Sequence, residues 1–110
     1  MDWIKIPNTN EEISTEFIQK GFNWFEATEY CKTNDYRLPT FAETELVYIP
    51  KNFWEWTLDT SLEFPDTKIL RGGSFSGGSC FLGTSVRYSI APGNRSYLIG
   101  FRCVRKEENK

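Results

Sequence analysis

Hydrophobic and polar residues alternate in the first part of the chain. The apolar phrase WIKIP is followed by the turn-rich PNTN, and Ile13, Thr15 and Phe17 then alternate with polar neighbours. An alternation with a period of two is typical of half-buried strands, so the pattern predicts a two-stranded hairpin. A short helix over residues 11–19 is the alternative, because paired glutamates before an apolar run also begin helices.

The next segment, FNWFEATEYCKTN, has the spacing of a helix. Asn23 precedes Glu26 by three residues, which is a capping box in which the glutamate reaches back to the backbone amide of the cap. The side chains that fall on one face at helical spacing are those of Trp24, Ala27 and Cys31. Asn34 and Asp35 are expected to end this helix.

A second, shorter helix is predicted after the extended RLP phrase. Thr40 and Glu43 repeat the capping box. Pro50 is expected to close the segment, because proline has no amide hydrogen to continue a helix. One mixed, amphipathic face is formed by Phe41, Glu45 and Tyr48.

Three later segments have the pattern of strands. In NFWEWTLD, Trp54, Trp56 and Leu58 stand at period two, which predicts a half-buried strand with both tryptophans in the core rather than on a ligand platform. The phrases KILRGGSF and LIGFRCVR predict two more strands, and SLEFPDTK predicts a loop before them. The order of elements predicts an α+β domain over residues 1–106, with a frayed polar tail at 107–110.

Size and composition limit the class of protein. The chain has 110 residues, of which 39% are hydrophobic and 16% aromatic. These values fit a single globular domain whose core needs neither metal nor disulfide. No apolar run approaches the roughly 20 residues of a membrane span, and the start lacks the basic and apolar segments of a secretory signal. We therefore expect a monomer made in the cytoplasm without membrane insertion.

The net charge of −2 hides an uneven distribution. Residues 1–70 carry 13 acidic and 6 basic side chains, whereas residues 71–106 carry 6 basic and no acidic ones. A basic segment is one sign of nucleic-acid binding. Here, however, it contains widely spaced arginines: Arg71, Arg87, Arg95 and Arg102. We expect them to pair with the acidic first two-thirds of the chain, and we expect no nucleic-acid partner.

Cysteine usage excludes a zinc site. The chain contains Cys31, Cys80 and Cys103 at wide spacing, and it has no histidine. Structural zinc sites use about four Cys or His ligands, so the sequence indicates neither zinc nor another cofactor. Free thiols in a reducing compartment are the expected state.

Three phrases, in order along the chain, resemble a known enzyme family. FNWFEATEYCKTNDYRLPT, NFWEWTLD and LRGGSF…GFRCVR are similar to phrases of the formylglycine-generating-enzyme (sulfatase-modifying-factor) family, and they cover roughly 80 residues. The resemblance implies a C-type lectin-like fold. In that fold two helices pack on a small antiparallel sheet with a loop-rich face.

The chain departs from the enzyme at the catalytic thiols. The family's oxidases use a pair of cysteines shortly after RGGS, whereas this chain has the single Cys80 in SFSGGSCFL. Cys103 stands in the GFRC phrase, where a cysteine is common in the family without being catalytic. We therefore expect all three thiols to be packed or idle, and we expect no enzymatic activity. The alternative function is a formylglycine-generating-type oxidoreductase acting on protein cysteine.

The resemblance also suggests two further binding functions, for calcium and for sugars. Family members bind calcium near the NxWEW phrase, where Asn52, Glu55 and Asp59 stand in this chain. Acidic residues beside a strand are usually only solvated, so we expect no metal site. A carbohydrate-binding lectin is the second alternative function. It would need sugar-binding carboxylates, and residues 71–102 contain no Asp or Glu.

The spacing after RGGSF resembles a narrower group, the variable proteins of diversity-generating retroelements. In that group a fixed frame alternates with short blocks at which asparagine codons of a template are rewritten at adenines. The resemblance places the frame at Arg71–Phe75, Arg87, Pro92, Arg95 and Ile99–Arg102, with Phe75 in place of the usual Trp. Within this variable region, residues 71–102, it implies thirteen ligand-binding positions: Ser76, Gly77, Gly78, Cys80, Phe81, Val86, Tyr88, Ser89, Ile90, Ala91, Ser96, Tyr97 and Leu98.

Two features of this region agree with the resemblance. Codons derived from AAC or AAT by changes at adenine cannot encode Lys, Glu, Gln, Met or Trp, and none of these occurs between Ile69 and Arg105. Tyr, Ser and Gly dominate the region, which is the mix that gives antibody paratopes rigid contacts and adaptable hydrogen bonds. Tyr88, Tyr97 and Phe81 are the expected anchors.

The expected function is therefore a non-catalytic binding module, a variable protein whose partner is a protein or a small-molecule ligand. Display on a cell or virus surface is compatible with this function. An alternative is kept for Phe81, Ile90 and Leu98, which would also suit the core of an irregular sheet.

Overall fold

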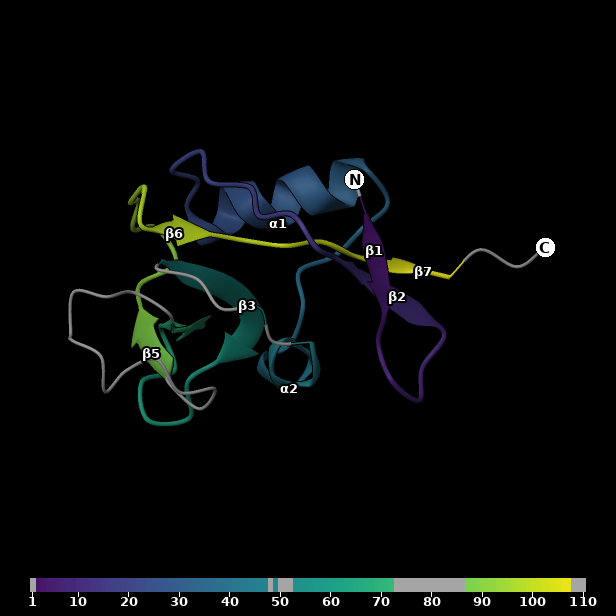
Figure 1. The fold of residues 1–110 in the computed structure, drawn as a ribbon. Helices are drawn as coiled ribbons and strands as arrows, with labels where there is room; N and C mark the ends of the chain where they lie inside the picture. The colour runs from purple at the N-terminus through teal and green to yellow at the C-terminus, as the bar shows by residue number, and fades with distance from the viewer. Residues whose placement is uncertain (1, 48, 50–52, 73–86, 108–110) are drawn as a thin grey trace.

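Two sheets and two helices make up the computed structural model, which describes residues 2–47, 49, 53–72 and 87–107 (Figure 1). In chain order the elements are β1 (Trp3–Lys5), β2 (Glu11–Ser14), α1 (Trp24–Thr33), α2 (Phe41–Leu46), β3 (Trp54–Thr60), β4 (Lys68–Arg71), β5 (Arg87–Ile90), β6 (Ile99–Gly100) and β7 (Val104–Lys106). In the part of the chain that is described, no helix has the length and apolar character needed to cross a bilayer.

The first sheet has the strand order β1-β2-β7 and is antiparallel throughout. Its β1–β2 hairpin confirms the prediction from the alternating pattern, and the alternative helix is absent from the described residues 11–19. The strand ends at Ser14, earlier than predicted, because the following residues pair elsewhere: Ile18 bridges Phe101. Ile13 is fully buried between the hairpin and the rest of the fold.

The second sheet has the strand order β5-β4-β3-β6. The pairs β5–β4 and β4–β3 are antiparallel, whereas β6 runs parallel to β3, so this sheet is mixed rather than wholly antiparallel as expected. The predicted single strand LIGFRCVR is divided into β6 and β7. The division has a topological reason, because the segment leaves the second sheet at Gly100 and joins the first sheet at Val104.

Both predicted capping boxes are present. Asn23 Oδ1 accepts the Glu26 N–H at 2.8 Å, and Glu26 Oε1 accepts the Asn23 N–H at 3.0 Å. Helix α1 ends at Thr33 with Asn34 as its cap, and its buried face contains Ala27 and Cys31, as predicted. Each box satisfies two amide donors that a helix start would otherwise leave without partners.

Helix α2 begins at the second capping box but differs from the sequence prediction on its buried face. Phe41 and Thr44 are buried, whereas Glu45, predicted to share a face with Phe41, is exposed. The helix ends at Leu46, so it stops before the predicted Pro50. Tyr48 and Pro50 lie outside the described residues.

The main core lies between α1 and strand β3. Trp56 is fully buried, and its Nε1 donates to the Phe22 carbonyl at 3.1 Å. Trp54 packs against the same core, which confirms the core assignment of both tryptophans. The strand is not half-buried as predicted, because Glu55 and Thr57 on its other face are also fully buried. Helix α2 covers that face.

A buried ion pair ties β3 to the C-terminal segment. Arg102 donates to both oxygens of Glu55, from Nε to Oε2 and from Nη2 to Oε1, each at 3.0 Å. Its Nη1 donates to the Val47 carbonyl at 2.8 Å. Both charged side chains are fully buried, so each supplies the partner that the other needs away from water.

The described strands β5 and β6 of the variable region lie at one side of the molecule. Strands β1 and β7, which carry the two ends of the described chain, lie on the right of Figure 1, whereas β5 and β6 lie on the left.

Glu107, at the start of the predicted frayed tail, donates its N–H to the Asn10 carbonyl at 2.7 Å.

Candidate recognition face

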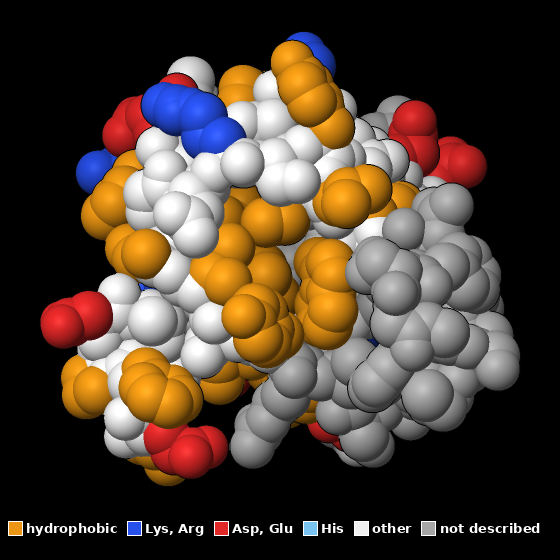
Figure 2. All heavy atoms as spheres, turned by 90° about the vertical axis from the view of Figure 1, so that its left-hand side faces the viewer, with side chains coloured by type: hydrophobic (Ala, Val, Ile, Leu, Met, Phe, Trp, Pro, Cys, Tyr) orange, Lys and Arg blue, Asp and Glu red, His pale blue; other side chains and the backbone are white. Residues whose placement is uncertain are grey.

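Three of the predicted ligand-binding residues expose large apolar side chains. Tyr88 on β5 is 60% exposed, and Tyr97 and Leu98, before β6, are 77% and 54% exposed. The side of the molecule that carries these strands shows a group of hydrophobic side chains at its middle, with charged side chains around the edge (Figure 2). Exposed apolar residues that gather on one face are the usual mark of an interaction surface.

The remaining predicted positions are distributed as follows. Ala91 is exposed, Ser89 and Ser96 are half-buried, and Ile90 packs against the main core, in line with the core alternative kept for it. Six of the thirteen positions lie outside the described residues: Ser76, Gly77, Gly78, Cys80, Phe81 and Val86.

Four of the predicted frame residues have the opposite environment. Arg71 and Arg102 are fully buried, and Ile99 and Phe101 are almost fully buried. The frame residue Arg95 is exposed. The contrast between the two sets is sharpest where exposed Leu98 is followed by buried Ile99, whereas Ile90 and Arg95 depart from it.

The predicted pairing of the C-terminal arginines with the acidic part of the chain is confirmed for those whose side chains are described. Besides the buried pair of Arg102 with Glu55, Arg95 Nη2 lies 3.0 Å from Glu26 Oε2. Arg71, fully buried, has Nη1 3.8 Å from a carboxylate oxygen of Glu45 and its guanidinium over the Phe41 ring. The side chain of Arg87 is outside the described residues.

Tyr97 is positioned by residues from the loop before α1. A Cβ placed on Gly21 would lie 3.2 Å from the Tyr97 ring, so the ring packs directly on the glycine backbone. Gly21 also has a φ of +70°, which other residues seldom adopt. Gln19 Nε2 donates to the Tyr97 carbonyl at 3.0 Å. These two contacts fix the place of the most exposed tyrosine of the face.

Trp54 supports the other two exposed positions. Its ring centroid lies 6.0 Å from that of Tyr88, and its backbone N–H donates to the Leu98 carbonyl at 2.7 Å. The sequence placed Trp54 in the core but missed this supporting role, as it missed Gly21 and Gln19. A sequence pattern does not report pairings between segments so far apart along the chain.

A hollow borders this face and is lined mainly by residues that the sequence analysis did not single out. Its volume is about 1010 Å³, and its walls come from the end of β3, the β3–β4 loop, and Tyr88 and Ser89 of β5. Two of the predicted ligand-binding residues therefore also line a concave site. Ligand sites are commonly concave, with apolar walls and a few polar groups.

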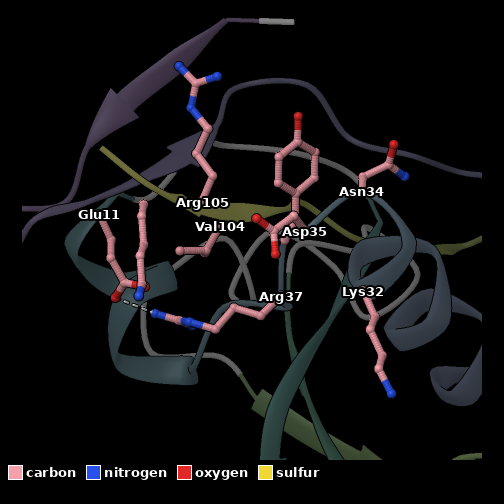
Figure 3. A pocket seen from close by; sticks show the side chains of 9 residues that line it. Glu11, Lys32, Asn34, Asp35, Arg37, Val104 and Arg105 are labelled. Atoms are coloured by element: carbon pink, nitrogen blue, oxygen red, sulfur yellow. Dashed lines mark hydrogen bonds and ion pairs between the residues drawn. The ribbon is translucent and has the colours of Figure 1, made fainter. Parts of the chain in front are cut away.

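A second hollow, of about 520 Å³, lies at the other end of the fold, between β7 and the end of α1 (Figure 3). Both arginines that line it form ion pairs with nearby glutamates. Arg37 Nη2 lies 2.7 Å from Glu11 Oε1 and 2.7 Å from Glu43 Oε2, and Arg105 Nε lies 2.9 Å from Glu12 Oε1. The two arginines that line this hollow, Arg37 and Arg105, are therefore engaged in ion pairs within the protein.

The network shifts two pKa values. The hydrogen bonds that Arg37 donates to Glu43 and Glu11 raise the pKa of Arg37 far above its ordinary value, despite the opposing effect of burial. Burial alone would raise the pKa of Glu43, but hydrogen bonds from Arg37 and from Thr40 outweigh it, so the pKa lies below its usual range. Both groups are consequently held in their charged forms.

The thiols of Cys31 and Cys103 face each other in the core. Their Sγ atoms are 3.4 Å apart, and both side chains are fully buried. The hydrogen bond between them, together with burial, raises the pKa of the Cys31 thiol well above its ordinary range. Both thiols are fully buried and so out of reach of a substrate, which gives the pair a packing role, as predicted for both residues.

The acidic residues near the WEW phrase are engaged within the protein. Glu55 binds Arg102, and Asp59 Oδ2 accepts the Phe41 N–H at 3.3 Å, while Asn52 lies outside the described residues. Across the described part of the chain, no three thiol or carboxylate side chains converge as metal ligands would.

The fold and its loop-rich face together define an α+β domain of the C-type lectin-like class. The family model described as "Sulfatase-modifying factor enzyme 1-like domain" matches residues 51–107, which is just over half of the chain, and the chain belongs to this family. No curated protein sequence matches the chain significantly.

Among solved structures, the fold is similar to one titled "Major Tropism Determinant U1 Variant". The TM-score is 0.64 at 13% sequence identity, and the match covers 76% of this chain. It covers 37% of the other chain, so the protein corresponds to little more than a third of the structure that it matches. The similarity at this level of identity establishes the shared fold.

Proposed function

We propose that the chain is a non-catalytic ligand-binding module, the variable protein of a diversity-generating retroelement, which displays a diversified recognition surface on a C-type lectin-like scaffold. One observation carries the proposal. Tyr88, Tyr97 and Leu98, which the family resemblance implies to be diversified, are exposed on one face, while the neighbouring frame residues Ile99 and Phe101 are buried.

The chemistry of the exposed residues supports this function. Tyrosines bring a large contact area while they immobilise few torsions on binding, so they serve well as anchors. Tyr88 and Tyr97 are in addition held by Trp54 and Gly21 before any ligand arrives. A preorganised anchor loses less conformational entropy on binding than a mobile one. The partner of this face is a protein or a small molecule.

The name of the similar structure also supports a role in recognition. "Major Tropism Determinant" describes a protein that determines tropism, and a face whose residues vary on a constant scaffold suits the choice of a target. Since that chain is much longer than this one, the proposal covers the shared domain.

The absence of catalysis is part of the proposal. Cys31 and Cys103, the two thiols that lie close together, are fully buried, which keeps a cysteine-containing substrate away from them. The protein is therefore expected to show no oxygen-dependent activity on a cysteine-containing peptide. If it did, and if Cys80→Ser abolished that activity, the binding-module proposal would be contradicted.

The decisive test is at the DNA level. The locus should contain a near-identical repeat of the variable region that differs mainly at adenines, together with a gene for a reverse transcriptase. Among independent isolates, substitutions should be concentrated at the thirteen codons of the predicted ligand-binding positions. Isolates that vary no more at these codons than at the frame codons would show that the region is not diversified.

A further inference from the structure

The hollow beside β5 is built largely from sequence outside the variable region. Its lining residues are Asp59, Thr60, Ser61, Leu62, Glu63, Phe64, Thr67, Ile69, Tyr88 and Ser89. Residues 59–69 of this set, called here the fixed wall, belong to β3, β4 and the loop between them. Tyr88 and Ser89 of the neighbouring strand β5 complete the lining, so the hollow shares these two residues with the recognition face.

The fixed wall presents apolar side chains that the fold does not use. Leu62 is 99% exposed and Phe64 is 60% exposed. Single exposed apolar residues are common, but here two of them stand at one hollow together with Tyr88. Covering these side chains would remove apolar surface from water at no loss to the core, because they contribute little to it.

The loop that carries these side chains is fixed by its own hydrogen bonds. Ser61 N–H donates to the Thr67 carbonyl at 3.2 Å, which closes the base of the loop. The Phe64 carbonyl accepts the Thr67 N–H at 2.9 Å and the Thr67 hydroxyl at 2.7 Å. The Ser61 hydroxyl oxygen accepts the Phe64 N–H at 3.2 Å. A loop held in this way has little order left to gain on binding.

The charge at the hollow is acidic. Among the residues that line it, Asp59 and Glu63 are ionisable as acids and none is Lys or Arg. Lys68 on β4 borders the hollow, because its Nζ donates to Oγ1 of the lining residue Thr60 at 2.9 Å and lies 4.2 Å from the centroid of the Trp24 ring. One cation beside two lining carboxylates leaves the local charge negative. The hollow is therefore complementary to a positive charge beside an apolar group.

We propose that the fixed wall is a constant subsite of the recognition face, and that it takes a segment of a protein ligand in which an apolar side chain stands next to lysine or arginine. This inference rests on the proposed function, since it makes the fixed wall a part of the same recognition face that diversification does not change. Each variant would thus keep one common preference while Tyr97, Leu98 and their neighbours change the rest of the specificity.

A displayed library of random 12-residue peptides, selected on the immobilised full chain, tests the subsite. We expect the enriched peptides to carry Leu or Phe beside Lys or Arg. Leu62→Ala and Glu63→Gln should each weaken the binding of these peptides by about fivefold or more, as loss of a central contact does. The matched controls are Ile4→Ala, on the exposed hairpin at the other end, and Glu29→Gln, on exposed α1 surface, and both should bind as the unaltered protein does.

The double variant Tyr97→Ala, Leu98→Ala separates the subsite from the proposed function. Peptides whose binding depends on Tyr97 and Leu98, but not on Leu62 or Glu63, would overturn the subsite and leave the recognition face standing. Dependence on Leu62 and Glu63 alone would support the subsite and count against the wider face. A library that yields no peptide dependent on Leu62 or Glu63 contradicts the subsite.

Discussion

Tyr97 packs on the backbone of Gly21, and this contact shows how a constant residue positions a variable one. The glycine is required twice, because its φ is +70° and because a Cβ at this place would meet the ring at 3.2 Å. The sequence suggested Tyr97 as an anchor through the family spacing. It gave no sign of Gly21, because no local pattern connects residues so distant along the chain.

Gly21→Ala should lower the free energy of unfolding by about 1–3 kcal/mol, the usual cost of forcing a side chain into a disfavoured backbone region. Gly93→Ala is the matched control, since a Cβ at Gly93 would meet nothing within 4 Å. Urea unfolding of both variants gives the comparison. Equal stabilities for the two variants would show that the Gly21 backbone and its contact with Tyr97 are not constrained.

The buried thiols lead to a second prediction at this scale. In a Cys80→Ser background, iodoacetamide should modify Cys31 and Cys103 very slowly in the native protein and rapidly in urea. Burial keeps the reagent away from both thiols, and the raised pKa of Cys31 in addition suppresses the thiolate of that residue. Mass spectrometry after timed labelling measures the two rates. Native labelling as fast as labelling in urea would contradict the packing role of the pair.

At the scale of the element, local signals predicted the helices better than the strands. The two capping boxes are formed by residues three apart, so Asn23 and Thr40 mark the helix starts where the structure has them. The burial of β3 on both faces could not be predicted in the same way. Glu55 and Thr57 are polar, and their burial depends on α2 and on Arg102, which come from other parts of the chain.

Glu43 makes stability depend on pH at this scale. Its folded-state pKa lies below the ordinary value of 4.5, so its contribution is complete above pH 4.5 and is lost as the pH falls through the folded-state value. Glu43→Gln should be less stable than the unaltered protein by about 1–3 kcal/mol at pH 7, the range for hydrogen bonds to a charged group.

The difference in the free energy of unfolding between Glu43→Gln and the unaltered protein should shrink as the pH falls below 4.5. Urea unfolding across pH 3–7 measures this difference. Glu29→Gln, at an exposed site on α1, should lose less than about 0.5 kcal/mol at pH 7. A stability difference for Glu43→Gln that stays constant across this pH range would show that the ion pair with Arg37 is not its source.

For the whole molecule, the pair of Glu55 and Arg102 is the link between the second sheet and the C-terminal segment. Arg102→Met should destabilise the protein by about 3–5 kcal/mol, because it removes the two hydrogen bonds that the guanidinium donates to the buried Glu55 carboxylate. The double variant Glu55→Leu, Arg102→Met should be more stable than Arg102→Met alone, since the buried Glu55 carboxylate that has lost the Arg102 guanidinium is then also removed. A double-mutant cycle by urea unfolding tests this, and an additive result would mean that the two residues act independently.

The family phrases predicted the overall fold. Each phrase contains a residue set with a clear structural role, which is a capping box, a core tryptophan or a buried frame arginine, and the three phrases follow one another along the chain in the family's order. They did not predict the fixed wall. Leu62, Glu63 and Phe64 were placed in a loop, and their importance depends on Tyr88 across the sheet. Surfaces assembled from separate loops are set by the tertiary fold, and so a linear pattern leaves them hidden.

The central claim is that exposed variable positions stand on a constant buried frame. Its most direct test compares the protease resistance of two libraries of single variants. In one library Tyr88, Ala91, Tyr97 and Leu98 are substituted one at a time, and in the other the frame residues Arg71, Ile99, Phe101 and Arg102. We predict changes below about 0.5 kcal/mol at most variable positions and losses above about 2 kcal/mol at most frame positions. Equal sensitivity of the two libraries would contradict the account.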